Sequence, residues 1–575
     1  MKRKHIVITS VGLFVLLFSF TFYQIKKNNE YKQIAGITHY NSEDISDLAV
    51  LCKVWGYLKY YHPAVVEGKY NWDDELIKMM QKILKSKNKE NRNQILSEWV
   101  TSLGEFTQDT LPKINPDSVK MHPDLDWIKD KKELGKLSDQ LEKIKTAKRQ
   151  NDTSFYVGFK KAQNPFFHEK LYPEMSYPDA SYRLLSLFRY WNIIQYYFPY
   201  KYLIGEDWKK ELPEFIPQFI NAKNELEYKL ILLKLIARIH DSHAFLYDPT
   251  IEKHKGDYIV PLLCSYVENK FIVTDTLVYN IEKQYPLKVG DIILKINGKS
   301  IENIISERLP YTSGSNLPSQ LRNLAFDLLR SQSNSITVSF TRANKILTKK
   351  IPCNLNNQAN FQNVFQKNKP LYQVLSKDRN IGYLYLGSSI GGTVPDLHNT
   401  IGLIIDLRCY PTEKVKGYMD MQELYEKPKK FAKFTATNFQ HPGLFECFEE
   451  YYTDIAKTDT TAKFFCKGFY KGKVVILVNE LTQSHAEFMT MMYRCSPTAT
   501  VIGSTTAGAD GNISFISLPG NVQTGITGLG VYYPDGRETQ RIGIVPDIVV
   551  KPTIKGIREG RDEVLEKAIE LIEKK

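Results

Sequence analysis

The residue best placed to do chemistry is Ser484, near the C-terminal end of the chain. It lies within residues 479–487, between an apolar run at 473–478 that predicts a strand and residues 488–493, which predict a helix. A serine at a helix N-terminus suits nucleophilic attack, because free N–H groups and the helix dipole stabilise developing negative charge. The same spacing fits a plain helix start, with Ser484 as N-cap and Glu487 completing a capping box. Spacing alone leaves both interpretations open and favours the plain cap.

A serine nucleophile needs a base whose pKa lies near neutrality, and histidine supplies it. One candidate stands in the motif Asp241-Ser242-His243, directly after a strongly helical run at 227–239. His485 adjoins Ser484, but side chains of neighbouring residues seldom face each other, so it is a poor base for that serine. The chain has 11 histidines, and residue type alone does not single out His243.

The segments around Ser484 predict the framework that positions it. From about residue 380, strands and helices alternate in an α/β pattern, with strands expected at 381–386, 400–407, 473–478 and 500–503. Active sites in such folds lie beyond the carboxyl ends of the strands. This directs attention to the turns after Arg408, Val478 and Gly503, and Ser484 follows the second of them.

The middle of the chain, residues 256–360, has the alternation of β-strands. The run LKVGDIILKINGKSI at 287–301 predicts a turn, a strand and a tight Asn-Gly turn, and a helix (319–330) and a strand (335–340) follow. This run resembles a PDZ domain. The resemblance implies that the module binds extended peptides by adding a strand to its sheet edge. The alternative is a plain β-module without a ligand.

The part before this module, residues 47–250, is predicted to be mostly helical and contains an internal repeat. Residues 48–63 match 184–199, and two tryptophan pairs keep one constant offset: Trp55 with Trp191, and Trp72 with Trp208. We therefore expect a first repeat at 31–175 and a second at 176–255, which carries the Ser-His motif. The aromatic stripe favours core packing over a ligand groove.

The N-terminus has the pattern of an export signal. Lys2, Arg3 and Lys4 precede an apolar run at 6–25 that is long enough to span a bilayer. Because no small-x-small cleavage site is clear, we expect residues 1–30 to remain as an anchor in the cell membrane, with the body facing the periplasm. A cleaved signal, giving a periplasmic or secreted protein, is the alternative, and a buried helix of a cytosolic protein is a third.

Composition excludes several classes of protein. The 575 residues are 42% hydrophobic and 25% charged, which is typical of folded soluble domains rather than disordered, collagen-like or polytopic membrane chains. The formal charge of +13 comes from scattered lysines without a basic stripe, so no nucleic-acid partner is expected. The seven cysteines have neither CxxC spacing nor a histidine at ligand distance, so no zinc site or other metal site is expected.

The order of these segments resembles the S41 serine peptidases, both the C-terminal processing and the tricorn types, over about residues 180–575. Four segments carry the resemblance: a strand ending in Asp-Leu-Arg at 406–408, VNELTQSHAE at 478–487, ATVIGSTTAGAD at 499–510 and GRETQRIGIVPDI at 536–548. The helical repeat is similar to the N-terminal part of Bacteroidetes-type S41 proteins. The implied fold is multi-domain α+β, with a crotonase- or ClpP-like α/β catalytic core at 370–575.

The resemblance implies one of two chemistries. Processing peptidases use a Ser–Lys dyad, but the lysine position of that motif is Ala509 here, so this mechanism is not expected. Tricorn-type members use a serine, a histidine preceded by a serine, and a glutamate. Ser484 and the pair Ser242-His243 match the first two of these, whereas the glutamate position is Gln540 and the nearest acid is Glu538.

The resemblance also implies an oxyanion hole built from backbone N–H groups. Many members have a Gly-rich turn after Asp-Leu-Arg, where this chain has Cys409 and Tyr410 followed by Pro411, which has no N–H. The implied donors are the N–H groups of His485, Cys409 and Tyr410. The expected protein is an exported serine endopeptidase that cleaves peptide or protein substrates through a Ser–His acyl-enzyme, without a cofactor. A catalytically inactive peptide-binding protein on the same fold, or an esterase using the same serine, is the alternative. The sequence does not indicate the oligomeric state.

Overall fold

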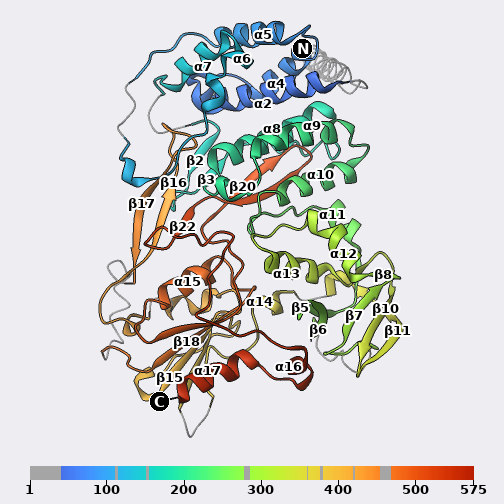
Figure 1. Cartoon of the computed structure of the whole chain (residues 1–575), viewed down its shortest axis with the longest axis vertical. Helices are drawn as coiled ribbons and strands as arrows, with labels where there is room; N and C mark the ends of the chain where they lie inside the picture. The colour runs from blue at the N-terminus through green and yellow to red at the C-terminus, as the bar shows by residue number, and fades with distance from the viewer. Residues whose placement is uncertain are drawn as a thin grey trace, which may run out of the picture.

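The computed structural model describes residues 40–109, 114–149, 154–277, 285–358, 361–375, 380–418, 421–453 and 468–574. The chain is a mixed α/β, multi-domain protein, as the sequence predicts, with helical layers, a β-rich middle module and an α/β core (Figure 1). The expected export segment, residues 1–30, lies outside the described residues. Within them, no helix is both long enough and apolar enough to cross a membrane.

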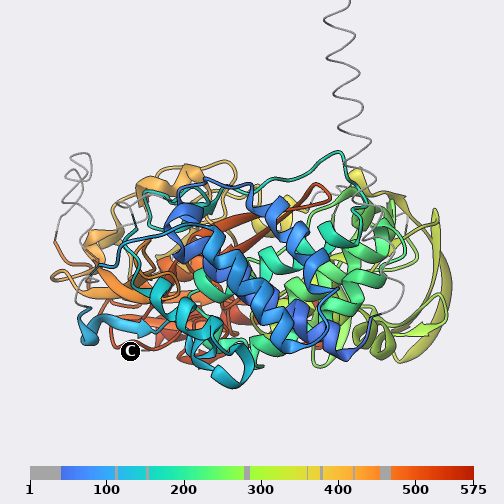
Figure 2. The ribbon, with the colours of Figure 1, turned by 90° about the horizontal axis from the view of Figure 1, so that it is seen from above.

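Two helical units form the N-terminal part, and Figure 2 shows the blue helices of the first packed against the green helices of the second. Side chains of Asn41 and Asp179 cap the two longest helices. The first unit contains α2 (Ser42–Tyr61), α4 (Trp72–Ile83), α5 (Lys89–Ser102) and α7 (Leu137–Lys145). The second contains α8 (Ala180–Tyr197), α9 (Glu211–Asn221), α10 (Glu225–Ala237) and α11 (Pro249–Lys255).

The predicted repeat is visible in two matching tryptophan pairs. The indole N–H of Trp55 donates to the carbonyl of Trp72, and that of Trp72 donates to the carbonyl of Trp55, both at 3.0 Å. Trp191 and Trp208 make the same reciprocal pair at 2.9 and 3.1 Å. All four rings are buried, so this part of the aromatic stripe belongs to the core rather than to a ligand groove.

The two units meet where α2 packs on α8, at Gly56 and Asn192, which occupy equivalent positions of the repeat. The side-chain amide of Asn192 donates to the carbonyl of Phe188 on its own helix (2.9 Å) and to that of Cys52 on α2 (3.1 Å). A Cβ atom at position 56 would lie 1.8 Å from Asn192 Oδ1. The close approach therefore requires glycine on one helix and uses asparagine on the other.

The middle module is an antiparallel sheet in the order β11-β10-β7-β6-β5. A short hairpin connects β7 and β8 through a turn at Asn297 and Gly298. Both residues have positive φ, as a two-residue Asn-Gly turn requires. The strands are β5 (Leu262–Val267), β6 (Lys270–Thr276), β7 (Ile292–Ile296), β10 (Ser335–Arg342) and β11 (Lys345–Pro352), and β8 (Lys299–Ser300) pairs with β7. The module also contains α12 (Ile301–Arg308) and α13 (Leu317–Asp327), which packs beside β5.

The core contains a sheet in the order β13-β14-β15-β18-β19-β23, parallel from β14 onward. Its central strands are buried apolar runs, as expected for a parallel sheet covered on both faces. The strands are β13 (Tyr372–Val374), β14 (Ile381–Tyr385), β15 (Gly402–Asp406), β18 (Lys473–Val478), β19 (Ala499–Gly503) and β23 (Ile548–Val549). The helices of this part are α14 (Gln362–Phe365), α15 (His485–Tyr493), α16 (Ile554–Glu559) and α17 (Glu563–Glu573).

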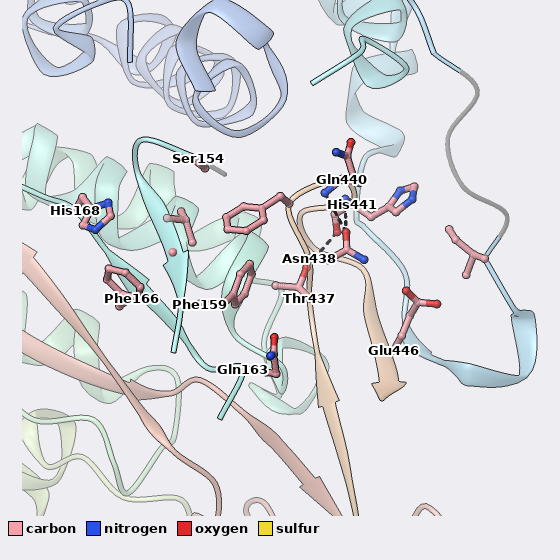
Figure 3. A pocket seen from close by; sticks show the side chains of 14 residues that line it. Ser154, Phe159, Gln163, Phe166, His168, Thr437, Asn438, Gln440, His441 and Glu446 are labelled. Carbon is pink, nitrogen blue, oxygen red and sulfur yellow. Dashed lines mark hydrogen bonds between the residues drawn. The ribbon is translucent and has the colours of Figure 1, made fainter. Parts of the chain in front are cut away.

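A second sheet, in the order β1-β17-β16-β22, stands beside the core. It joins β1 (Val119–Met121) from the helical part to β16 (Lys430–Ala436), β17 (Phe445–Tyr452) and β22 (Gly530–Tyr532). A cavity of about 730 Å³ lies between the tip of the β16–β17 hairpin and the hairpin of β2 (Val157–Phe159) and β3 (Pro165–Phe167) (Figure 3). Phe159, Phe166, Phe439 and Asn438 line it, whereas Ser484 and His243 do not.

The ribbon of β20 (Ile513–Leu518) and β21 (Val522–Thr527) departs from the domain limits that the sequence suggested. It belongs to the C-terminal segment of the chain, but it packs against α8 (Figure 1). Its residues Ile516, Leu518, Val522 and Ile526 share one core with the helices. The ribbon ends at Thr527, which is thereby brought beside the second helical unit.

Candidate active site

Ser484 stands at a strand–turn–helix junction, after β18 and directly before α15. Its backbone has φ 57° and ψ −120°. N-cap residues usually lie in the extended region, and a non-glycine residue with positive φ is strained by about 1–3 kcal/mol. The Ser484 N–H donates to the carbonyl of Ala509 (2.9 Å) and to Glu487 Oε2 (3.1 Å), which hold the strained conformation. A plain cap does not need this conformation, whereas a nucleophile presented on a sharp turn does.

Glu487 completes the capping box that the spacing suggests and does more than cap. Its carboxylate is fully buried and accepts the N–H groups of Gly508 (2.8 Å) and Ala509 (3.0 Å) and the hydroxyl of Thr506. Burial raises the pKa of Glu487, and these donors oppose the rise. Glu487 therefore ties residues 506–509 to the turn of Ser484. The side chain of Ala509 is a buried methyl group, which cannot act as a base.

His243 is 4% exposed and lies beside the end of the β20–β21 ribbon. Its Nδ1 is 2.8 Å from Thr527 Oγ1, and its backbone N–H donates to Asp241 Oδ1 at 3.0 Å. Burial lowers the pKa of His243, and the Asp241 carboxylate opposes this. Among the described residues, the buried Nε2 atom has no hydrogen-bond partner. A neutral imidazole with an open Nε2 is the form that accepts a proton.

The Ser242 hydroxyl forms its hydrogen bonds with groups other than the His243 ring. Its oxygen lies 2.9 Å from the carbonyl oxygen of Ala507 and 3.1 Å from Ser319 Oγ, which share its one hydrogen, and it accepts the N–H of Ser315 (2.8 Å). The two adjacent side chains point to different sides of the turn, as neighbours in an irregular segment commonly do. The hydroxyl on the ring is that of Thr527 instead.

The two candidates for the fourth catalytic group lie in different surroundings. Gln540 Nε2 donates to Asp241 Oδ1 at 3.2 Å, so this side chain joins the His243 cluster. Glu538 pairs with Lys120 Nζ at 2.7 Å and accepts the hydroxyl of Tyr202 at 2.9 Å. The structure thus brings Gln540 to the histidine motif and binds Glu538 elsewhere.

Direct hydrogen bonds join the Ser484 turn to the His243 motif. The side-chain amide of Gln483, immediately before Ser484, donates to the carbonyl of Ser242 at 3.2 Å. Ser242 in turn binds Ala507, two residues before the Ala509 carbonyl that accepts the Ser484 N–H. The serine and the histidine therefore stand on adjoining segments, one from the core and one from the helical part.

The candidate oxyanion donors differ in their surroundings. His485 is the first residue of α15, where backbone N–H groups point out of the helix end. Cys409 is buried, and burial raises the pKa of its thiol well above the usual range, which keeps the thiol protonated and unreactive. The Tyr410 N–H donates to the carbonyl of Phe365 at 2.9 Å, so in this conformation it is used within the chain.

Arg322 is a further residue of the site that has no signal in the sequence. It belongs to α13 of the middle module and is nearly buried. Its guanidinium donates to the carbonyl of Glu480 (2.6 Å) and to Gln483 Oε1 (2.9 Å), both in the turn before Ser484. Burial lowers the pKa of Arg322 to about 10, which still leaves it charged at neutral pH.

Comparison with known proteins shows a family match over part of the chain and a similar fold. Residues 389–550 match Peptidase family S41. The solved structure of mature CPAF complexed with lactacystin is similar with a TM-score of 0.50 at 14% identity, covering 68% of this chain and 98% of that one. A CPAF mutant gives 0.52 at 14% identity over 68% and 97%. A putative peptidase from Parabacteroides merdae ATCC 43184 gives 0.40 at 17% identity over 69% and 97%. No curated protein matches the sequence.

The fold, the strained serine and the family match define a serine-type peptidase. The family match covers residues 389–550, the part of the chain in which the order of motifs suggests this resemblance.

Proposed function

We infer that this chain is an exported endopeptidase in which Ser484 attacks the peptide carbonyl and His243 is the general base. The observation that carries the proposal is the positive φ of Ser484 at a strand–helix turn. Backbone strain held in place by buried hydrogen bonds is typical of functional residues. The open, buried Nε2 of His243 on an adjoining segment supplies the base.

The mechanism follows the general course of serine peptidases. His243 Nε2 accepts the proton of the Ser484 hydroxyl as its oxygen attacks the substrate carbonyl. The N–H groups of His485 and Cys409 stabilise the resulting oxyanion, with Tyr410 as a third donor once its bond to Phe365 opens. The imidazolium then protonates the leaving amine, and water hydrolyses the acyl-enzyme with His243 again acting as base.

The substrate class is a peptide or an unfolded protein segment. The middle module, residues 256–360, is proposed to work as a PDZ-like domain that receives an extended peptide beside β5 and α13. Arg322 connects this module to the Ser484 turn. Deletion of the middle module is expected to weaken cleavage of long substrates more than cleavage of short ones. An equal loss on both would show that the module is a structural brace.

Residues 1–30 are proposed to direct export, with the body facing the periplasm. The basic start and the following apolar run support this assignment. A mature protein that begins after about residue 25 would show a cleaved signal, and recovery in the cytosol with Met1 intact would contradict export.

A fluorophosphonate probe tests the active site directly. Such probes phosphonylate an activated serine, so a single label on Ser484 of the full chain is expected. Ser484→Ala should abolish both labelling and peptide cleavage while the protein stays folded, because only one small polar atom is removed. His243→Ala should slow labelling by about 10³-fold or more. Peptide cleavage by Ser484→Ala at the wild-type rate would reject the assignment, and turnover of esters alone would make the enzyme an esterase.

A further inference from the structure

Asp241 is the centre of a buried cluster that includes His243, Thr527 and Gln540. Asp241, Thr527 and Gln540 are all fully buried. Asp241 Oδ1 accepts the Thr527 hydroxyl (2.8 Å), the His243 N–H (3.0 Å) and the Gln540 amide (3.2 Å). Its Oδ2 accepts the Thr527 N–H at 2.6 Å. Four donors on one carboxylate satisfy a buried negative charge without a cation.

Counting protons in this cluster fixes the form of the histidine. A threonine hydroxyl has one hydrogen to donate, and Thr527 gives it to Asp241, which as a carboxylate can only accept. The contact between Thr527 Oγ1 and His243 Nδ1, at 2.8 Å, must therefore be a bond donated by the ring. Nδ1 carries the proton, and Nε2 is left with a lone pair, which is the tautomer that a general base needs.

We propose that Asp241 and Thr527 are the positioning residues of His243, with Asp241 supplying the carboxylate of the site through the Thr527 hydroxyl. This inference rests on the proposed function of Ser484 and His243. When His243 takes the serine proton, the ring becomes positive, and the chain Nδ1–H to Thr527 to Asp241 stabilises that charge. No proton leaves the carboxylate or the hydroxyl in this step, and the only transfer is from Ser484 Oγ to Nε2.

Gln540 fits this arrangement better than an acid would. The family resemblance leads one to expect a glutamate at position 540, but Gln540 Nε2 donates to Asp241 Oδ1. A glutamate there would bring a second carboxylate against Asp241 in a dry site, where two like charges repel and one must take up a proton. The amide of Gln540 and the carboxylate of Asp241 are therefore complementary. The negative charge of the site is carried by Asp241, the first residue of the Asp-x-His motif.

A matched pair of variants at Thr527 tests the proposal. Thr527→Val keeps the shape and the backbone bond to Asp241 Oδ2 but removes the hydroxyl, whereas Thr527→Ser keeps the hydroxyl. The measurement is the rate at which a fluorophosphonate labels Ser484 in the full chain between pH 4 and pH 9. Thr527→Val should lower the plateau rate by about 10²-fold, and Thr527→Ser should stay within a few-fold of wild type.

The pH profile separates positioning from a structural role. Without the link to Asp241, the imidazolium is less stabilised, so the acid limb of the labelling rate should move to lower pH in Thr527→Val. Asp241→Asn should move it in the same direction, and if that variant does not fold, the Thr527 pair decides alone. If Thr527→Val has the labelling rate and the acid limb of the wild type, the positioning role of Asp241 and Thr527 is overturned. Labelling of Ser484 that depends on His243 preserves the proposed function in that case, whereas a fully active His243→Ala overturns the proposed function itself.

Discussion

The guanidinium of Arg322 donates a hydrogen bond of 2.9 Å to the side-chain oxygen of Gln483, the residue immediately before Ser484. The amide nitrogen of the same Gln483 side chain donates to the carbonyl of Ser242 at 3.2 Å. One glutamine thus receives a bond from the middle module and gives one to the histidine motif. The three parts of the chain converge on the turn that carries the serine.

Arg322→Lys should therefore slow labelling of Ser484 by a fluorophosphonate probe. Lysine keeps the charge but does not offer the planar fork that binds two acceptors at once, so Glu480 and Gln483 lose their fixed spacing. We expect a loss of about 10- to 100-fold, because small displacements of reacting groups have effects of this size. The control is Arg308→Lys in the same module, whose guanidinium donates to the carbonyl of Asp327. Equal rates for both variants and the wild type would contradict a role for Arg322.

The strain at Ser484 predicts an unusual order of stability between two inactive variants. Glycine adopts positive φ readily, whereas alanine does not, so Ser484→Gly should unfold at a higher temperature than Ser484→Ala. We expect about 1 kcal/mol in favour of glycine. At Ser504, where φ is not positive, the same comparison should favour alanine. Calorimetry of the four variants gives the order, and alanine as the more stable residue at both positions would mean that the Ser484 turn is unstrained.

Much of the framework around Ser484 could be predicted from the sequence because it depends on local patterns. The strand before the serine, the helix after it and the capping glutamate follow from hydrophobic periodicity and from the spacing of Ser484 and Glu487. The tryptophan repeat could also be predicted, since both copies keep the same residue types at the same spacing.

The surroundings of His243 could not be predicted in the same way. Thr527 is remote from His243 in sequence and reaches it only because the β20–β21 ribbon packs into the helical part. The choice of Ser242 rested on the resemblance to tricorn-type members, and a motif match does not determine where a side chain points. The Asp-x-His spacing offered one usable signal, because an aspartate two residues before a histidine commonly accepts its backbone N–H in a tight turn.

The buried ring of His62 predicts that part of the folding stability depends on pH. Burial and the nearby Lys69 lower the pKa of His62 to about 4, whereas the unfolded chain has a histidine pKa of about 6.5. The folded state thus prefers the neutral ring, and its stability falls as the pH drops from about 6.5 through 4, by about 3 kcal/mol at most. His62→Phe should lose less stability than wild type over this range in urea unfolding. His122→Phe, at an exposed position, should behave as wild type, and identical curves for all three would contradict the assignment.

The contact between Gly56 and Asn192 predicts strong coupling between the two helical units. Gly56→Ala should destabilise the protein by about 1–3 kcal/mol, because a methyl group would overlap the Asn192 side chain. Asn192→Ala should also destabilise it, since two hydrogen bonds are lost. The double variant should lose less than the sum of the two, which a double-mutant cycle measures. Strict additivity would show that the helices move apart rather than clash.

Because the contact joins Gly56 to Asn192, the two helical units present different surfaces to each other. If two first units of neighbouring molecules paired, glycine would face glycine, and the amide that joins the carbonyls of both helices would be missing. If two second units paired, two asparagine side chains would compete for the space of one. Only a first unit with a second unit is complementary, and within one chain these are always present in equal number and close together. The duplicated segment thus carries a built-in preference for pairing unlike units over pairing like units during folding.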